Sequence, residues 1–277
     1  MSCIMKKIIS KYPTLFRFVL ATVLFALALF LSGLINKGDL KAYFPYASAI
    51  LLGIATWLLY KTEKKSLREI GLNFSLRNSS FLPLGVLIGA ITFLAAKYAR
   101  ALYTGESFNI TETINYSAIL YGLYVILPTV AVEEFLFRGY LFKKTIEKSN
   151  VIIANIIFSI LFMLIHVLDE NTMNNKGMMI FLIISIPVGH LLFATALLKS
   201  KTLFFPIGLH LGNNWATQHL ITDSNTGNSF LYITNNASFD TWSAFMGFIL
   251  IFNGVFLLVT SIIWKWDYFF KTKGIKE

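Results

Sequence analysis

Cysteine is almost absent from this chain. Its 277 residues include a single cysteine, Cys3, so no internal disulfide can form and a metal site built from cysteine ligands is excluded. Charged residues are also scarce, at 14%, whereas a soluble domain carries about 25%. Hydrophobic residues make up 56% of the chain, and the mean hydropathy is +0.66. The composition therefore predicts an integral membrane protein with the lipid bilayer as its first partner.

Several common catalytic motifs are missing as well. No serine or cysteine stands in a recognisable nucleophile setting, and the chain has neither an H-E-x-x-H sequence nor a glycine-rich phosphate loop. The net charge of +10 is compatible with nucleic-acid binding, but the basic residues fall in short loops between apolar runs. That distribution is typical of membrane topology, so we expect no nucleic-acid partner.

Long apolar runs supply eight candidate membrane spans, each near the ~20 residues that cross a bilayer. The seventh span is the least apolar and contains His210 and Asn214, so we expect it to line a cavity. The predicted fold is all-α, with about eight transmembrane helices enclosing an intramembrane polar cavity. The spans lie at residues 14–35, 42–60, 81–97, 120–142, 151–168, 178–198, 202–220 and 242–264.

Positive charge is distributed unevenly between the two sides of this arrangement. The positive-inside rule places the side richer in Lys and Arg in the cytoplasm. We therefore expect a multi-pass cell-membrane protein with both termini cytoplasmic, in a chain whose short length suggests a bacterial source. All but five of the 24 basic residues fall on the side of the termini, the exceptions being Lys37, Lys41, Lys97, Arg100 and Lys176.

Three segments are predicted along the chain. Residues 1–116 form the first three transmembrane helices, and residues 117–220 form a core segment that contains the polar residues Glu133, His166 and His210. Residues 221–277 comprise an outer loop, the last transmembrane helix and a basic cytoplasmic tail. The outer loop, from Ile221 to Asp240, is rich in Asn, Thr and Ser and is either a solvated connection or a lid.

Two adjacent glutamates interrupt the fourth span, in the sequence V-A-V-E-E-F-L-F-R-G-Y. A carboxylate in the hydrocarbon layer costs roughly 3 kcal/mol or more and requires a partner, water or a function. Glu134 and Arg138 are four residues apart, so they can form an ion pair, while Glu133 points about 100° away and is free to act in a cavity. The alternative is that both glutamates lie near the cytoplasmic interface, with Arg138 snorkelling.

Further polar side chains interrupt other apolar spans. His166 ends the run S-I-L-F-M-L-I-H one turn after Phe162, and His210 lies four residues before Asn214 on the same helix face. A glutamate can act as general base toward water, and histidine and asparagine can donate hydrogen bonds to an oxyanion. Hydrolysis by activated water is therefore the expected chemistry. Taken alone, each histidine is as readily a packing residue, and His190 and His219 are expected to be so.

Three motifs thus occur in order within separate spans: E-E-x-x-x-R from Glu133, F-x-x-x-H from Phe162 and H-x-x-x-N from His210. Over roughly residues 117–220 the chain resembles the CPBP intramembrane proteases, a family of CAAX proteases and bacterial Abi-type proteins. The resemblance implies an eight-helix fold around a cavity. It also implies hydrolysis of a peptide bond in a membrane-associated or lipidated protein or peptide.

The same resemblance implies roles for the motif residues. Glu133 and His166 would activate water, and His210 and Asn214 would stabilise the oxyanion. If a metal such as zinc binds, Glu133, His166 and His210 would be its ligands, as in a metalloprotease; a metal-free glutamate mechanism is the alternative. The remaining motif residues would support the site: Glu134, Arg138 and Phe162.

Two other functions remain open from the sequence. A non-proteolytic membrane partner, such as a bacteriocin-immunity or sensor-regulating protein that binds peptides, would be indicated by loss of a motif residue, and none is lost. An ion-coupled carrier would use Glu133 and Glu134 for transport. A geometric difficulty also remains, because straight helices over these spans would separate Glu133 and His166 by ~10 Å or more in depth.

Overall fold

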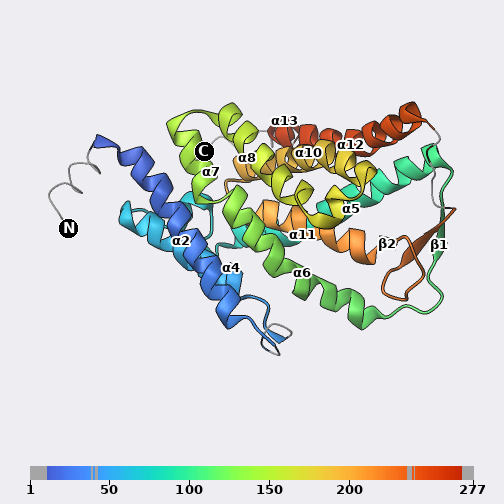
Figure 1. Cartoon of the computed structure of the whole chain (residues 1–277), viewed down its shortest axis with the longest axis horizontal. Helices are drawn as coiled ribbons and strands as arrows, with labels where there is room; N and C mark the ends of the chain where they lie inside the picture. The colour runs from blue at the N-terminus through green and yellow to red at the C-terminus, as the bar shows by residue number, and fades with distance from the viewer. Residues whose placement is uncertain (1–10, 39, 41–42, 236–238, 240, 270–277) are drawn as a thin grey trace, which may run out of the picture.

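The computed structural model describes residues 11–38, 40, 43–235, 239 and 241–269 (Figure 1). Cys3 and most of the predicted basic tail lie outside these residues. Among these described residues, eight helices of 16 residues or more form the bundle. They are α2 (Pro13–Ile35), α4 (Ala47–Thr62), α5 (Leu76–Thr104), α6 (Tyr116–Phe137), α8 (Val151–Val167), α10 (Lys176–Ser200), α11 (Phe204–His219) and α12 (Trp242–Trp264). Shorter helices are η1 (Leu67–Ile70), α7 (Tyr140–Lys148), α9 (Glu170–Met173) and α13 (Trp266–Phe269).

Each predicted span overlaps one of the eight long helices, which confirms a mostly helical, multi-pass membrane architecture. Within the described residues, five helical segments are long and apolar enough to cross a membrane: α2, α5, α6 continued by α7, α10 and α12. Helices α4 and α8 are apolar but have only 16 and 17 residues, and α11 has 16. The count of eight spans therefore stays a prediction.

Helix α5 is longer than its predicted span, residues 81–97, because its signals for starting and stopping lie outside the apolar run. The Ser75 hydroxyl accepts a hydrogen bond from the Asn78 amide and caps the N-terminus. Gly105 adopts a left-handed conformation (φ +73°) and ends the helix. The extension places Lys97, the last residue of the predicted span, within the body of the helix.

A small sheet covers one end of the bundle, at the right of Figure 1. It consists of β1 (Ser107–Ile110), β2 (Ile221–Thr222) and β3 (Leu231–Thr234), in the order β1-β3-β2. Strand β3 pairs antiparallel with β1 and parallel with β2. The loop predicted from Ile221 to Asp240 thus contains two strands in its described part, and it is tied to the segment that follows α5.

Helix α11 occupies the centre of the bundle, where it contributes buried residues to both hydrophobic clusters of the described chain. Glycines allow α5 and α11 to approach closely. A Cβ added at Gly89 would lie 2.1 Å from the Leu209 carbonyl oxygen, and one at Gly212 would lie 2.0 Å from the Val86 carbonyl oxygen. This confirms the close approach expected at Gly208 and Gly212. The close approach of the two helices fixes the position of His210, which lies between Gly208 and Gly212.

Candidate active site

The hairpin formed by α6, α7 and α8 brings the predicted catalytic residues to one level. Phe142 packs against Phe158 with ring centroids 5.6 Å apart, and Phe137 against Phe162 at 4.9 Å. The chain reverses after α7, where the Asn150 side chain caps α8. Because α7 continues to Lys148, beyond the predicted span end at residue 142, Glu133 and His166 lie equally far along the chain from this turn. The depth difference expected from straight helices is therefore removed.

Glu134 and Arg138 form the buried base of the site. Their side chains are both 0% exposed, and the Arg138 Nη1 donates to Glu134 Oε1 at 3.1 Å. The guanidinium lies 4.1 Å from the Phe162 ring centroid and 5.2 Å from that of Phe193. The predicted ion pair is confirmed, and snorkelling of Arg138 is wrong. A charge without access to water is stabilised here by its carboxylate and by two aromatic faces.

His210 connects the two glutamates. Its Nδ1 lies 2.8 Å from Glu134 Oε1, and its Nε2 lies 3.5 Å from Glu133 Oε2. An ionised carboxylate only accepts hydrogen bonds, so Nδ1 carries a proton and Nε2 is the atom directed to Glu133. The imidazole stacks on Phe193, with centroids 4.6 Å apart and ring planes at 19°. The expectation that Glu133 would be alone in a cavity is therefore wrong: it lies beside His210 and is not among the described residues that line the cavity.

His166 has one ring nitrogen engaged and one available. Its Nδ1 lies 2.8 Å from the Phe162 backbone carbonyl oxygen, which can only accept a hydrogen bond. In the neutral imidazole, Nδ1 is therefore the donor and Nε2 holds the lone pair. The F-x-x-x-H spacing thus has two physical purposes: Phe162 supports Arg138 with its ring and fixes the His166 tautomer with its carbonyl group.

A cavity of about 540 Å³ contains part of this constellation. His166, His210 and Asn214 line it, together with aromatic side chains from α5, α10 and α12. Towards the sheet end of the bundle, the lining continues to Lys97 and Asp223, whose charged atoms are 3.5 Å apart. The cavity therefore runs from the histidines to the end of the bundle that carries the three strands.

Of the predicted residues, Phe162, His166, His210 and Asn214 line this cavity, whereas Glu133, Glu134 and Arg138 are not among its described lining residues. Glu133 lies beside the lining residue His210, with its Oε2 3.5 Å from the His210 Nε2. Two contributors were missed. Phe193 lies in an apolar stretch with no motif to single it out. Lys97 was placed at the outer end of the third predicted span, although its position directly after the apolar run F-L-A-A could have indicated a buried cation; it is 8% exposed.

The other two histidines have different surroundings. His190 is buried between Phe142 and Phe162, with centroid distances of 5.9 and 6.4 Å, which agrees with a packing role. Neither of its ring nitrogens has a hydrogen-bond partner among the described residues. His219 lies near the sheet, where its Nδ1 is 2.8 Å from the Asn228 carbonyl oxygen.

No group of three or more His, Cys, Asp or Glu side chains in the described ranges is placed to hold a metal ion. The Nδ1 of His210 is held by Glu134 and that of His166 by the Phe162 carbonyl oxygen, so the two Nε2 atoms are the ones that would bind zinc together with Glu133. The zinc site therefore stays a prediction.

The comparison with protein families adds an independent observation. Residues 115–216 match the family model described as type II CAAX prenyl endopeptidase Rce1-like. This stretch is an Rce1-like domain. It includes all three motifs, and its family is one of CAAX endopeptidases, so the resemblance and the enzyme class predicted from the motifs, a peptide hydrolase, are confirmed. No curated protein and no solved structure matches the chain.

The cavity is formed by the Rce1-like domain together with helices outside it. Its α11 packs along its length against α5, which precedes the matched residues, and α12, which follows them, supplies Phe248 and Phe252 to the cavity wall. The match lies over most of the predicted core, residues 117–220, while the cavity draws on all three predicted segments.

Proposed function

We propose that the chain is an intramembrane endopeptidase that hydrolyses a peptide bond of a membrane-associated protein or peptide with water activated by Glu133 and His166. The observation that carries this proposal is the continuous set of contacts from Arg138 through Glu134 and His210 to Glu133. It holds a histidine at a cavity within an apolar bundle and a carboxylate directly beside that histidine, which is a costly arrangement to maintain without a chemical function.

Water activation is assigned to the two groups at the level of Glu133. The water oxygen attacks the carbonyl carbon of the scissile bond, and its proton passes to the Glu133 carboxylate or to the free Nε2 of His166. When the tetrahedral intermediate collapses, the carbon–nitrogen bond breaks and the same proton is delivered to the leaving amine. The products are a new carboxyl terminus and a new amino terminus, and both protein groups return to their starting states.

Stabilisation of the oxyanion is assigned to His210 and Asn214. Preorganised donors of this kind contribute about 3–4 kcal/mol each to the transition state. Glu134 and Arg138 act as positioning residues, because they hold the His210 ring through Nδ1 and leave Nε2 directed into the site. A second proton, on Nε2, makes this nitrogen a hydrogen-bond donor and makes His210 a cation. The carboxylates of Glu133 and Glu134 are then balanced by His210 and Arg138.

The cavity suggests what kind of substrate fits. Its aromatic wall suits an apolar chain or a lipid group, and the buried Lys97 near its far end suits an anionic group. The exposed Asp223 is the carboxylate that Lys97 contacts here, at 3.5 Å. We infer a substrate that presents an apolar segment to the bundle and a carboxylate to Lys97.

A comparison of the protein termini present in host membranes tests the proposal. Wild type is compared with Glu133→Gln and with Glu112→Gln, an exposed carboxylate outside the site, at equal protein abundance. Termini that are lost with Glu133→Gln and retained with Glu112→Gln support proteolysis and identify the substrate. Identical termini in all three strains, with a phenotype that still needs the protein, would instead favour a non-proteolytic partner that binds peptides.

A further inference from the structure

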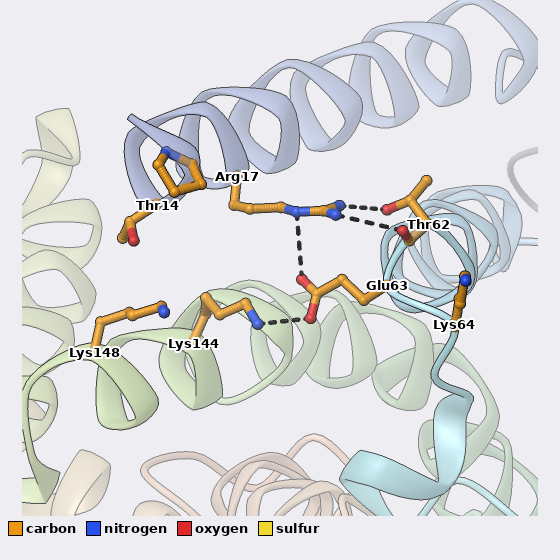
Figure 2. Close-up of a pocket in the computed structure, with 8 residues that line it drawn as sticks. Thr14, Arg17, Thr62, Glu63, Lys64, Lys144 and Lys148 are labelled. Carbon is orange, nitrogen blue, oxygen red and sulfur yellow. Dashed lines mark hydrogen bonds and ion pairs between the residues drawn. The ribbon is translucent and has the colours of Figure 1, made fainter. Parts of the chain in front are cut away.

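A second cavity lies where α2, α4 and α7 come together, on the side that the basic residues predict to be cytoplasmic (Figure 2). Its volume is about 390 Å³, and it is separate from the candidate active site. Figure 2 shows Thr14 and Arg17 on α2 facing Lys144 and Lys148 on α7 across this space. Lys64, which follows α4, also lines it. Among the described residues, four cations and one carboxylate, that of Glu63, thus surround one hollow.

The single carboxylate is engaged by the wall of the cavity. Glu63 Oε2 accepts a hydrogen bond from Lys144 Nζ at 2.7 Å, and Glu63 Oε1 lies 3.8 Å from Arg17 Nε and accepts from the Tyr140 hydroxyl. Lys144 also contacts Glu147 at 2.9 Å. The negative charge of Glu63 is therefore already shared between cations, and it does not neutralise the whole lining.

Lys64 and Lys148 are the uncompensated charges of this cavity. Both are exposed, and neither forms an ion pair with any residue that the structure describes. Lys64 also has a φ of +58°, a left-handed conformation that is uncommon outside glycine. This conformation ends α4, because the Lys65 amide donates back to the Tyr60 carbonyl oxygen, and it sets Lys64 at the rim of the cavity.

The wall from α2 adds fixed donors. The Arg17 guanidinium donates through Nη1 to the Thr62 hydroxyl and through Nη2 to the Thr62 carbonyl at 3.3 Å, which holds it across the cavity. Helix α2 begins here without a side-chain cap and without an acidic residue in its first turn. The positive end of its dipole is therefore not offset by a local carboxylate.

We propose that this cavity binds a phosphate group, and that the headgroup of an anionic phospholipid supplies it. Basic pockets between helices at the cytoplasmic surface suit anionic headgroups, and arginine and lysine together provide the donors that phosphate oxygens accept. The neighbouring turns of α2 expose Leu15 (62%) and Val19 (53%), an apolar surface for the acyl chains. The site requires no hydrolysis and is independent of the proposed function.

The experiment measures the thermal stability of the full-length protein in detergent while a short-chain lipid or salt is added. The probes are dioctanoyl phosphatidylglycerol, dioctanoyl phosphatidylcholine and inorganic phosphate. Lys148→Gln and Lys64→Asn are combined to remove the free charges, with asparagine chosen because it tolerates a positive φ. The matched control combines Lys265→Gln and Arg68→Gln, exposed cations on the same predicted side that do not line the cavity.

Phosphatidylglycerol is expected to raise the Tm of wild type and of the control at lower concentration than phosphatidylcholine does. Each lysine removed from the cavity should weaken the apparent affinity about fivefold, so the double variant should require a far higher concentration. An equal response to inorganic phosphate would support the phosphate site and identify free phosphate as its source. Equal responses to the two lipids, or an unchanged response in the cavity variant, would overturn the proposal.

Discussion

Glu133 and Glu134 are neighbours in sequence but have different surroundings. The Glu134 side chain is 0% exposed and pairs with both Arg138 and His210, whereas that of Glu133 is 18% exposed and, among the described basic side chains, pairs within 4.0 Å only with His210. At the scale of single residues, the buried Arg138 depends on Glu134 for its only carboxylate within 4.0 Å among the described residues. Neutralising one or the other glutamate should therefore have different consequences.

Glu134→Gln is expected to destabilise the protein strongly. It leaves the Arg138 charge buried without a carboxylate, a change that typically costs about 3–5 kcal/mol. Unfolding in detergent should show a clearly lower Tm than for Glu133→Gln, which removes a partly exposed group. Equal Tm values for the two variants would mean that Arg138 does not rely on Glu134.

Much of this residue-scale arrangement could be predicted from spacing. The Glu134–Arg138 pair follows from the helical repeat, and His210 and Asn214 share a face for the same reason. The contact between Glu134 and His210 could not be predicted, because it joins α6 and α11, and one sequence does not specify how two helices are rotated about their axes. Phe193 was missed because an aromatic residue in an apolar run is most often ordinary packing.

At the scale of secondary-structure elements, the packing of α5 on α11 fixes the position of His210 and Asn214. Gly89→Ala places a methyl group where the Leu209 carbonyl oxygen lies, and backbone cannot move aside as a side chain can. We expect a loss of about 1–3 kcal/mol and a lower Tm.

Gly254→Ala in α12 is the matched control, since nothing lies within 4 Å of its added Cβ. It should leave the Tm unchanged or raise it slightly, because alanine is the better helix former. A Gly89→Ala protein as stable as the Gly254→Ala protein would show that α5 and α11 do not approach as closely as described.

The ends of α2, α4 and α7 are joined through Glu63. Burial raises the pKa of this carboxyl group, but hydrogen bonds from Lys144 and Tyr140 and the nearby positive charges outweigh that effect and lower the pKa below 4.5. The contribution of Glu63 to stability is therefore complete above pH 4.5 and is lost as the pH falls through the lowered value.

Glu63→Gln should accordingly reduce the free energy of unfolding by about 1–3 kcal/mol at pH 7. Thermal unfolding over a pH series measures this difference. It should shrink as the pH is lowered below 4.5, because wild type then loses the same charge. A difference that stays constant down to pH 3 would contradict a role for the ionised carboxylate.

Helices were the part of the fold most accessible to sequence reasoning, because long apolar runs mark them directly. The continuation of α7 to Lys148 was missed since Lys143, Lys144 and Lys148 resemble the end of a span, although Lys144 is 8% exposed and pairs with Glu63. The strands were missed for another reason. With two to four residues each, they are too short for an alternating pattern to be distinguished from a polar loop.

For the whole molecule, the two cavities lie toward opposite ends of the bundle. The basic cavity is at the ends predicted to face the cytoplasm, and the catalytic cavity extends toward the sheet. If the predicted orientation is right, substrate reaches the histidines from the outer side or from within the bilayer. Orientation is thus the property that decides where the substrate comes from.

The single cysteine makes this orientation simple to measure. In a Cys3→Ser background, Asn225→Cys reports on the sheet end and Lys148→Cys on the opposite end; both positions are exposed. We expect a membrane-impermeant thiol reagent to label Asn225→Cys in intact cells and Lys148→Cys only after permeabilisation. The reverse pattern would place the catalytic cavity on the cytoplasmic side.

The central claim is that Glu133 activates water for peptide hydrolysis. Its most direct test is the rate at which purified protein in liposomes cleaves the substrate identified by the comparison of protein termini. Glu133→Gln should lower kcat by about 10²–10⁴-fold, the range expected for loss of a general base, while its Tm stays within a degree or two of wild type. Cleavage at the wild-type rate by stably folded Glu133→Gln would contradict the account, because no other carboxylate is assigned to activate water.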